Sequence, residues 1–199
     1  MNLGNQNEPK QTEERWHYQT PLIYRSISDF VMQWLPDEDR EIVIVCIGTD
    51  RSTGDALGPI TGSLLSRWKQ PHFSIYGTLK KPVHALNLAD TLTAIRNNHK
   101  EPFIIAIDAC LGRQSSIGSI KAGIGAVRPG LALKKDLPPV GDLHITGIVN
   151  ASTPVDYLTL QNTRLHLVME LAELISKSLH HLHRNYAAEI ERKLYKRLS

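Results

Sequence analysis

Two strongly apolar segments, each followed by an aspartate, constrain the fold of this chain more than any other feature. Residues 42–47 and 103–107 are rich in β-branched side chains and lack polar alternation, which is typical of strands covered on both faces in a largely parallel sheet. Asp108 directly follows the second segment, and Asp55 follows the first after a short glycine-rich turn. Open α/β sheets bind ligands outside the carboxyl ends of their strands. We therefore expect these two acids to lie at one edge of the sheet.

The remaining hydrophobic pattern predicts helices between the strands. Apolar residues recur near the helical period in several segments, and shorter apolar or alternating runs indicate further strands. The predicted helices cover residues 22–35, 55–68, 86–97 and 155–182, and the further strands cover residues 73–76, 117–127 and 144–149. This alternation predicts an α/β fold in three layers, α/β/α, with a mostly parallel mixed sheet.

The chain divides into three parts. Residues 1–20 are polar and of mixed charge, so we expect a flexible N-terminal arm. Residues 21–182 carry the apolar segments and are predicted to form a single α/β/α domain. Residues 183–199 are predicted to form a basic helical C-terminal tail.

Charge and composition argue against several classes of protein. The formal net charge is only +3 over 199 residues, so nucleic acid is not an expected partner. No stretch approaches the roughly 20 apolar residues that span a bilayer, and no secretory leader is recognisable at the start. Cys46 and Cys110 adjoin apolar runs and are expected to be reduced. These features predict a cytoplasmic protein that does not interact with membranes.

Asp55 and Asp108 form the candidate catalytic pair. Two carboxyl groups held close in a partly desolvated cleft cannot both ionise easily, so one keeps its proton while the other activates water. The alternative is structural: Asp55 caps the helix that follows it, and Asp108 accepts hydrogen bonds from loop amides. Residue chemistry alone leaves both interpretations open.

Two histidines suggest a second use of the same acids. His84 and His144 lie near predicted strand edges, and either one, together with Asp55 and Asp108, would complete a site suited to a divalent metal such as Zn or Ni. Packing is the alternative role of each histidine.

Further residues are expected to line the cleft. The glycines of the first turn match no nucleotide-binding motif, so they are expected to shape the turn. The predicted substrate-binding residues are Gly48, Asp50, Gly54, His84 and Asn150.

Four motifs together resemble a known family. They are IGTDRSTGDALGP (47–59), IIAIDAC (104–110), GDLHITGIVN (141–150) and LQNTRLHLVMELA (160–172). Their order and spacing resemble the YyaC family of sporulation proteins from endospore-forming bacteria. That family is similar to the germination protease, which degrades small acid-soluble spore proteins, and more distantly to the hydrogenase maturation peptidases. The resemblance implies a phosphorylase/hydrolase-like fold.

The resemblance also implies roles for the two aspartates. The catalytic acids of the germination protease correspond by motif to Asp55 and Asp108. In the hydrogenase maturation peptidases, two acids and a histidine bind the metal of the substrate. Asp55 and Asp108 match those acids, whereas neither His84 nor His144 lies in a segment that matches the histidine.

These observations predict a sporulation-associated, peptidase-like hydrolase of the germination protease clan, in the cytoplasm of the sporulating cell or forespore. Its expected substrate is a protein or peptide, with small acid-soluble spore proteins as the first candidates, and no cofactor is required. One alternative is a non-catalytic spore protein of the same fold that binds partners through the cleft or the basic tail. Another is a metal-dependent hydrolase that uses Asp55, Asp108 and His84 or His144. Association into a homo-oligomer is compatible with all three.

Overall fold

A six-stranded sheet forms the centre of the molecule. The computed structural model describes residues 12–36, 40–130 and 137–198. The strands lie in the order β1-β5-β6-β4-β2-β3. Strand β5 runs antiparallel to both of its neighbours, β1 and β6, while β6, β4, β2 and β3 are parallel. The bounds are β1 Glu13–His17, β2 Ile42–Cys46, β3 Phe73–Tyr76, β4 Phe103–Gly112, β5 Ser119–Ile124 and β6 Leu143–Ala151.

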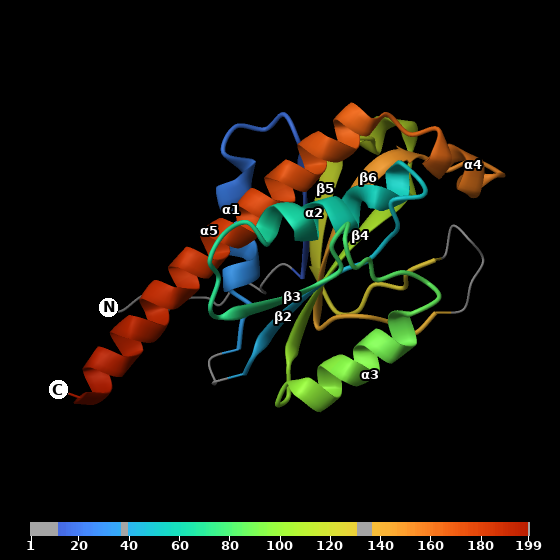
Figure 1. The fold of residues 1–199 in the computed structure, drawn as a ribbon. Helices are drawn as coiled ribbons and strands as arrows, with labels where there is room; N and C mark the ends of the chain where they lie inside the picture. Colours follow the sequence, from blue (N-terminus) through green and yellow to red (C-terminus); the bar gives the residue numbers. More distant parts are fainter. Residues whose placement is uncertain (1–11, 37–39, 131–136, 199) are drawn as a thin grey trace.

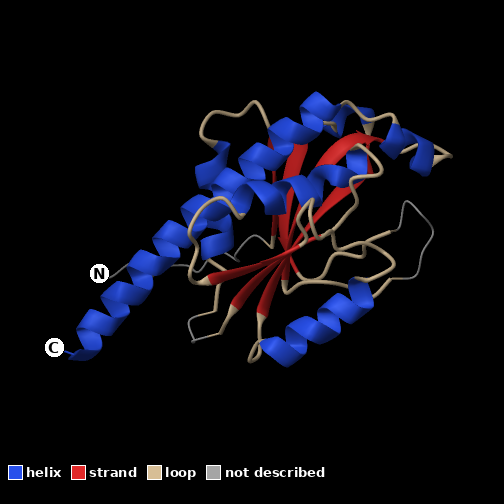
Figure 2. Ribbon diagram, viewed as in Figure 1, coloured by secondary structure: helices blue, strands red, loops and turns tan. Residues whose placement is uncertain are grey.

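Helices cover both faces of this sheet, unequally. Helices α1 (Ile23–Met32), α2 (Leu57–Leu65) and α5 (Leu165–Leu198) lie on one face, and α3 (Leu88–Asn98) lies on the other (Figures 1 and 2). The predicted α/β/α fold with a mostly parallel mixed sheet is therefore confirmed.

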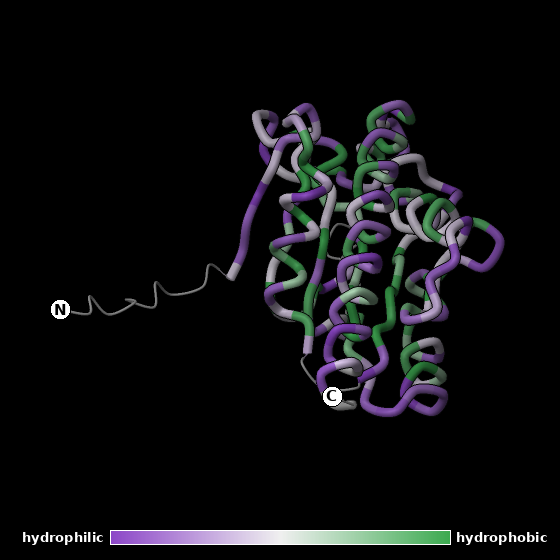
Figure 3. The backbone as a smooth tube through the Cα atoms, turned by 90° about the vertical axis from the view of Figure 1, so that its left-hand side faces the viewer, coloured by the Kyte–Doolittle hydropathy of each residue, from purple (hydrophilic) through white to green (hydrophobic). Residues whose placement is uncertain are grey.

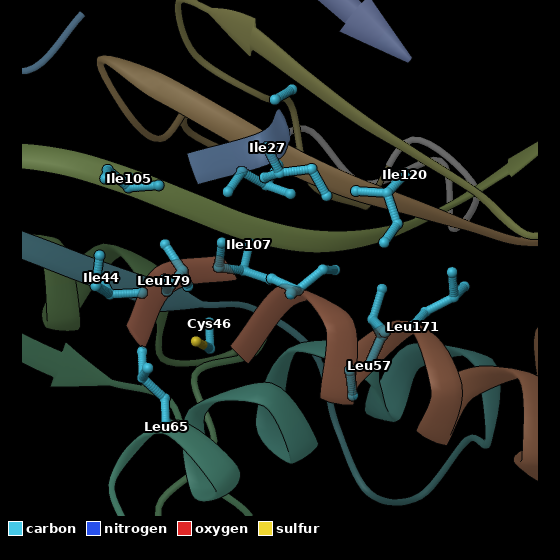
Figure 4. Packing of buried hydrophobic residues seen from close by; sticks show 14 of the residues in the cluster. Ile27, Ile44, Cys46, Leu57, Leu65, Ile105, Ile107, Ile120, Leu171 and Leu179 are labelled. Carbon is cyan, nitrogen blue, oxygen red and sulfur yellow. The ribbon is translucent and has the colours of Figure 1, made fainter. Parts of the chain in front are cut away.

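The strand pattern explains the two hydrophobic clusters. In β2, Ile44 packs with the three-helix layer, and its neighbours Val43 and Val45 pack with α3. All residues of β2 are buried, as expected for a strand covered on both faces. Figure 4 shows the larger cluster, where side chains of the sheet meet those of α2 and α5. Hydrophobic segments run along the inside of the layered body, and polar ones lie mainly outside (Figure 3).

The predicted N-terminal arm extends too far along the chain. Residues 13–17 form β1 and pair with β5 at the edge of the sheet, while residues 1–11 of the arm lie outside the described residues. An edge strand needs only one neighbour for its backbone hydrogen bonds, so a polar sequence suffices. Trp16 adds an apolar anchor, because its ring packs edge-on against Phe30 with centroids 5.9 Å apart.

The C-terminal helices also differ from the prediction. The expected helix over residues 155–182 is divided into α4 (Asp156–Gln161) and α5, separated by a turn at which Thr163 is buried. The predicted tail over residues 183–199 is no separate part, since α5 continues through it to Leu198. His183 is only 6% exposed, so the first turn beyond residue 182 still packs against the domain. None of the helices in the described residues is long and apolar enough to cross a membrane.

Candidate active site

Asp55 lies on a tight turn between β2 and α2. A short 3-10 helix, Gly54–Ala56, carries it, and α2 begins only at Leu57 with no side-chain cap. The structural alternative, in which Asp55 caps the following helix, is therefore wrong. The turn closes through a hydrogen bond of 3.1 Å from the backbone amide of Thr49 to the backbone carbonyl of Asp55. The carboxyl group of Asp55 therefore makes no capping hydrogen bond to the start of α2.

Gly48 makes this turn possible. Its φ is +141°, and a Cβ atom there would lie 1.9 Å from the carbonyl oxygen of Asp55. No other residue avoids that clash, because glycine alone has no side chain at such close backbone contact. Gly48 therefore sets the position of Asp55 through the backbone.

Asp108 projects from the middle of a long strand. Strand β4 continues past it to Gly112, and Asp108 pairs in register with Thr146 of β6. The residue is 7% exposed, and one carboxyl oxygen accepts a hydrogen bond of 2.9 Å from the backbone amide of Ala109. The strand places this acid on the face of the sheet opposite to Ile107, away from the three-helix layer.

Both acids line one cavity of about 350 Å³. Burial, and next the charge of Asp55, raise the pKa of Asp108 well above its ordinary value, although the Ala109 amide opposes the rise. Burial also raises the pKa of Asp55, opposed by a backbone hydrogen bond from Thr49 and by the nearby His84. The chain thus holds two carboxyl groups, from distant segments, in one partly desolvated space. We call this space the acidic cavity; its other lining residues are Ala109, Cys110, Leu111, Val127, Arg128, Gly130, Ser152, Asp156 and Leu160.

Three further residues that were predicted to line the cleft lie outside the acidic cavity. Gly54 supports the turn, since a Cβ atom there would lie 2.9 Å from Leu160. Asn150 links β6 to the start of the C-terminal helices by donating to the carbonyl of Thr159 and the hydroxyl of Thr163, both at 3.3 Å. Asp50 is exposed and lies outside the lining. None of these three residues lines the acidic cavity.

The two histidines occupy different places. His84 is close enough to Asp55 to lower its pKa, but it does not line the acidic cavity. His144 shares a hydrogen bond of 2.9 Å between its Nδ1 and the carbonyl of Gly125, and it lines a neighbouring cavity.

The predicted metal set is not assembled. Within the part of the chain that the structure describes, no group of three His, Cys, Asp or Glu side chains is placed to hold a metal ion. The sequence-based set of Asp55, Asp108 and a histidine therefore does not fit a metal.

Ser152 and Asp156, which were not predicted from the sequence, line the acidic cavity. Asp156 accepts hydrogen bonds from the Ser152 hydroxyl at 3.0 Å and from the Thr153 amide at 2.8 Å. Asp156 is the first residue of α4, and Ser152 lies in the short connection between β6 and α4. A serine and an aspartate around a proline are a helix-start pattern, but that pattern does not indicate which cavity the turn faces.

The family of the chain follows from a sequence comparison. Residues 15–178 match a family described as "Protein of unknown function (DUF1256)". This chain belongs to the DUF1256 family. The matched range contains all six strands of the sheet except the first two residues of β1, and it contains both candidate acids.

Two other proteins are similar to this DUF1256 chain. One is "Uncharacterized protein YyaC" of Bacillus subtilis (strain 168), which is 54% identical over 140 residues, covering 70% of this chain and 68% of that protein. This match confirms the resemblance to YyaC. The other is the crystal structure of a [NiFe] hydrogenase maturation protease, HycI, from Thermococcus kodakarensis KOD1. It has a TM-score of 0.43 and 18% identity, and the match covers 75% of this chain and 98% of that one.

Proposed function

We propose that this DUF1256 protein is an aspartate-dependent peptide hydrolase whose catalytic acids are Asp55 and Asp108. One observation carries the proposal: two carboxyl groups line the same cavity, and burial raises the pKa of each. A structural carboxylate normally gains an ion pair or several hydrogen bonds that favour its charged form. Here the surroundings favour a shared proton, which is the condition that acid and base catalysis by two aspartates requires.

The different burial of the two acids supports different roles for them. Asp108 is the more deeply buried and its pKa is raised more strongly, so it is the acid that keeps the shared proton. Asp55 is the more exposed and provides the carboxylate. General acid and base catalysis is most effective when such groups can exchange protons near the working pH.

Hydrolysis then proceeds by balanced proton transfers. Asp55 takes a proton from water as the water oxygen bonds to the carbonyl carbon of the peptide, and Asp108 gives its proton to the carbonyl oxygen. When the tetrahedral intermediate collapses, the C–N bond breaks and the departing amine takes the proton from Asp55. Asp108 recovers its proton as the carbonyl forms again, so both acids return to their starting states.

The apolar part of the lining supports this chemistry. Leu160 and Val127 border the acidic cavity, and apolar side chains beside the acids lower the local dielectric. Charge that develops on the substrate there interacts more strongly with the two aspartates than it would in water.

The first experiment is incubation of the purified protein with small acid-soluble spore proteins, which the resemblance to sporulation proteins makes the first candidate substrates. Fragments are followed by mass spectrometry for the wild type, Asp55→Asn and Asp108→Asn, each with and without chelator. Discrete cleavage that both variants lose is the expected result. Asp50→Asn is the matched control, since Asp50 comes from the same turn but lies outside the acidic cavity. Full activity in both cavity variants would refute the mechanism, and loss of wild-type activity with chelator would support the metal-dependent alternative.

A further inference from the structure

A second, larger cavity adjoins the acidic one. Its volume is about 760 Å³, and it shares Cys110, Leu111 and Val127 with the acidic cavity. We call it the basic cavity, because its polar lining includes Arg15, Arg113, Lys121, His144, Ser115 and Ser116. This size lies within the range of ligand-binding clefts in proteins.

The position of the basic cavity follows from how α3 covers the sheet. Side chains of α3 form one cluster with Val43 and Val45 of β2 and Ala106 of β4. The same face of β6 and β5 presents His144, Thr146 and Lys121 to the cavity instead. Polar side chains at these positions are expected if α3 does not cover this part of the sheet and a ligand can bind there.

A register row connects the two cavities. Asp108 of β4 pairs with Thr146 of β6, Thr146 pairs with Lys121 of β5, and Lys121 pairs with Arg15 of β1. Paired residues of neighbouring strands point to the same face. The row therefore leads from the candidate acid to two cations across four adjacent strands.

The spacing of this row follows from sheet geometry. Neighbouring strands lie about 4.8 Å apart, so Lys121 and Arg15 lie about 10–14 Å from Asp108 along the row. An extended peptide advances about 3.3 Å per residue. A peptide bond beside Asp108 would place a side chain about three or four residues away among these cations.

Among the described residues, two of the three cations have no acidic partner. Lys121 makes an ion pair of 2.7 Å with Glu13. Arg15 donates to the hydroxyl of Ser116 at 3.4 Å, and in the described part of the chain neither Arg15 nor Arg113 has a carboxylate within ion-pair distance. Both guanidinium groups are therefore available to an external anion, and a guanidinium fork suits a carboxylate.

Cys110 lies at the boundary between the two cavities, and the cations of the basic cavity affect the pKa of its thiol. Burial raises the pKa of Cys110 to about 11, while Lys121 and Arg15 act in the opposite direction and favour the thiolate. The positive field of the basic cavity thus reaches the edge of the acidic cavity.

We infer that the basic cavity binds a carboxylate side chain of an acidic peptide substrate, about three or four residues from the bond that is cleaved. This inference rests on the proposed function for the identity of the ligand as a peptide. The favoured substrate has Glu or Asp at that position, and Arg15 and Arg113 are its specificity-determining residues.

The test measures binding separately from cleavage. Two pools of randomised decapeptides, one with a fixed Glu-Glu pair and the other with Gln-Gln at the same positions, are passed over immobilised wild-type protein at low salt. Mass spectrometry measures both the peptides retained and any fragments. We expect the Glu-Glu pool to be retained about tenfold more strongly, as for an electrostatic contact that steers and orders a ligand.

The variant Arg15→Gln/Arg113→Gln removes these two cations and leaves the pair of Lys121 with Glu13 intact. It should lose most of the preference for Glu-Glu, whereas Arg96→Gln, an exposed cation on α3 outside the lining, should keep it. Thermal melting checks that each variant is folded. If the double variant unfolds, wild-type retention with rising salt replaces it, and a preference that persists unchanged at high salt contradicts the inference.

The outcomes separate this inference from the proposed function. A preference for Glu-Glu that depends on Arg15 and Arg113, without fragments, supports the basic cavity and counts against hydrolysis. Equal retention of the two pools, with fragments that Asp108→Asn abolishes, supports hydrolysis and overturns the inference. Retention of neither pool also overturns it.

Discussion

The acidic cavity and the basic cavity lie side by side on one face of the sheet, yet their charged groups have opposite surroundings. Asp108 is 7% exposed, and its surroundings disfavour its charge. Lys121 is 29% exposed in its side chain, and Arg15 is exposed, so these cations keep contact with water. Depth in the sheet therefore separates an acid whose charged form is disfavoured from cations that remain in contact with water. Burial suits a group that must exchange a proton, and exposure suits a group that attracts a charged ligand.

The largest expected effect concerns the acidic cavity. Asp108→Asn should reduce peptide hydrolysis by about 10³-fold or more, because the amide cannot donate and recover the proton that the mechanism requires. Arg113→Gln should leave kcat within a few-fold of the wild-type value, because Arg113 lines the basic cavity and not the acidic cavity. Steady-state kinetics on one cleaved peptide checks both, and equal losses of kcat would remove the functional distinction between the cavities.

The next prediction compares two glycines, one packed against backbone at the acidic cavity and one in open space near the basic cavity. Gly48→Ala should destabilise the protein by about 3 kcal/mol or more, since the new Cβ atom would overlap the carbonyl of Asp55. Gly125, whose carbonyl meets His144, has φ +93°, and a Cβ atom added there would have no neighbouring atom within 4 Å. Gly125→Ala should therefore cost only about 1 kcal/mol, from backbone strain alone. Urea unfolding measures both, and equal costs would mean that the turn at Asp55 can relax.

A pH dependence of stability should belong to the acidic cavity. Because the pKa of Asp108 is raised in the folded protein, the folded state keeps a proton that the unfolded state releases above its ordinary pKa of 3.8. Stability contributed by this site therefore falls as the pH rises from about 4 towards neutrality.

Asp108→Asn should remove this decrease in stability at higher pH, because the amide does not titrate. Its free energy of unfolding should exceed the wild-type value by about 1–2 kcal/mol at neutral pH, and the difference should shrink as the pH falls towards 4. Denaturant unfolding at a series of pH values measures this difference. A variant that is less stable than the wild type at neutral pH would show that Asp108 is a structural carboxylate.

The smallest expected effect is the salt dependence of the basic cavity. The KM for an acidic peptide should rise several-fold between low and physiological ionic strength, because exposed charges are screened over about 8–10 Å. In Arg15→Gln/Arg113→Gln the rise should be smaller, while kcat changes little in either protein. A salt dependence that survives intact in the double variant would place the responsible charges elsewhere.

Much of the fold could be predicted from local sequence. The apolar runs of β2 and β4 are too continuous for exposed strands, and the spacing of apolar residues in α1, α3 and the first part of α5 matches a helical face. Asp55 and Asp108 could be paired because each follows the apolar run of a parallel strand, and such runs lead to the same edge of the sheet. Strand β4 itself continues past Asp108 to Gly112. These inferences need only neighbouring residues and a general rule of topology.

Other features depended on contacts between distant segments. Arg15 stands in a polar stretch that resembles a loose arm, and only pairing with β5 places it beside Lys121. Asp50 lies close to Asp55 in the sequence, and Asn150 lies near the end of β6. Neither of them lines the acidic cavity, although residues at comparable positions do. Strand order and register set these positions, and neither is encoded by local periodicity.

The sequence by itself determined the layered α/β architecture and the two acids, because burial of apolar strands and helix faces leaves a local pattern along the chain. Only the tertiary structure decided that Asp108, Thr146, Lys121 and Arg15 form one row, since that row joins four strands through pairings between distant residues. It also decided that the pKa of Asp108 is raised, because the depth at which a side chain lies depends on every element packed around it.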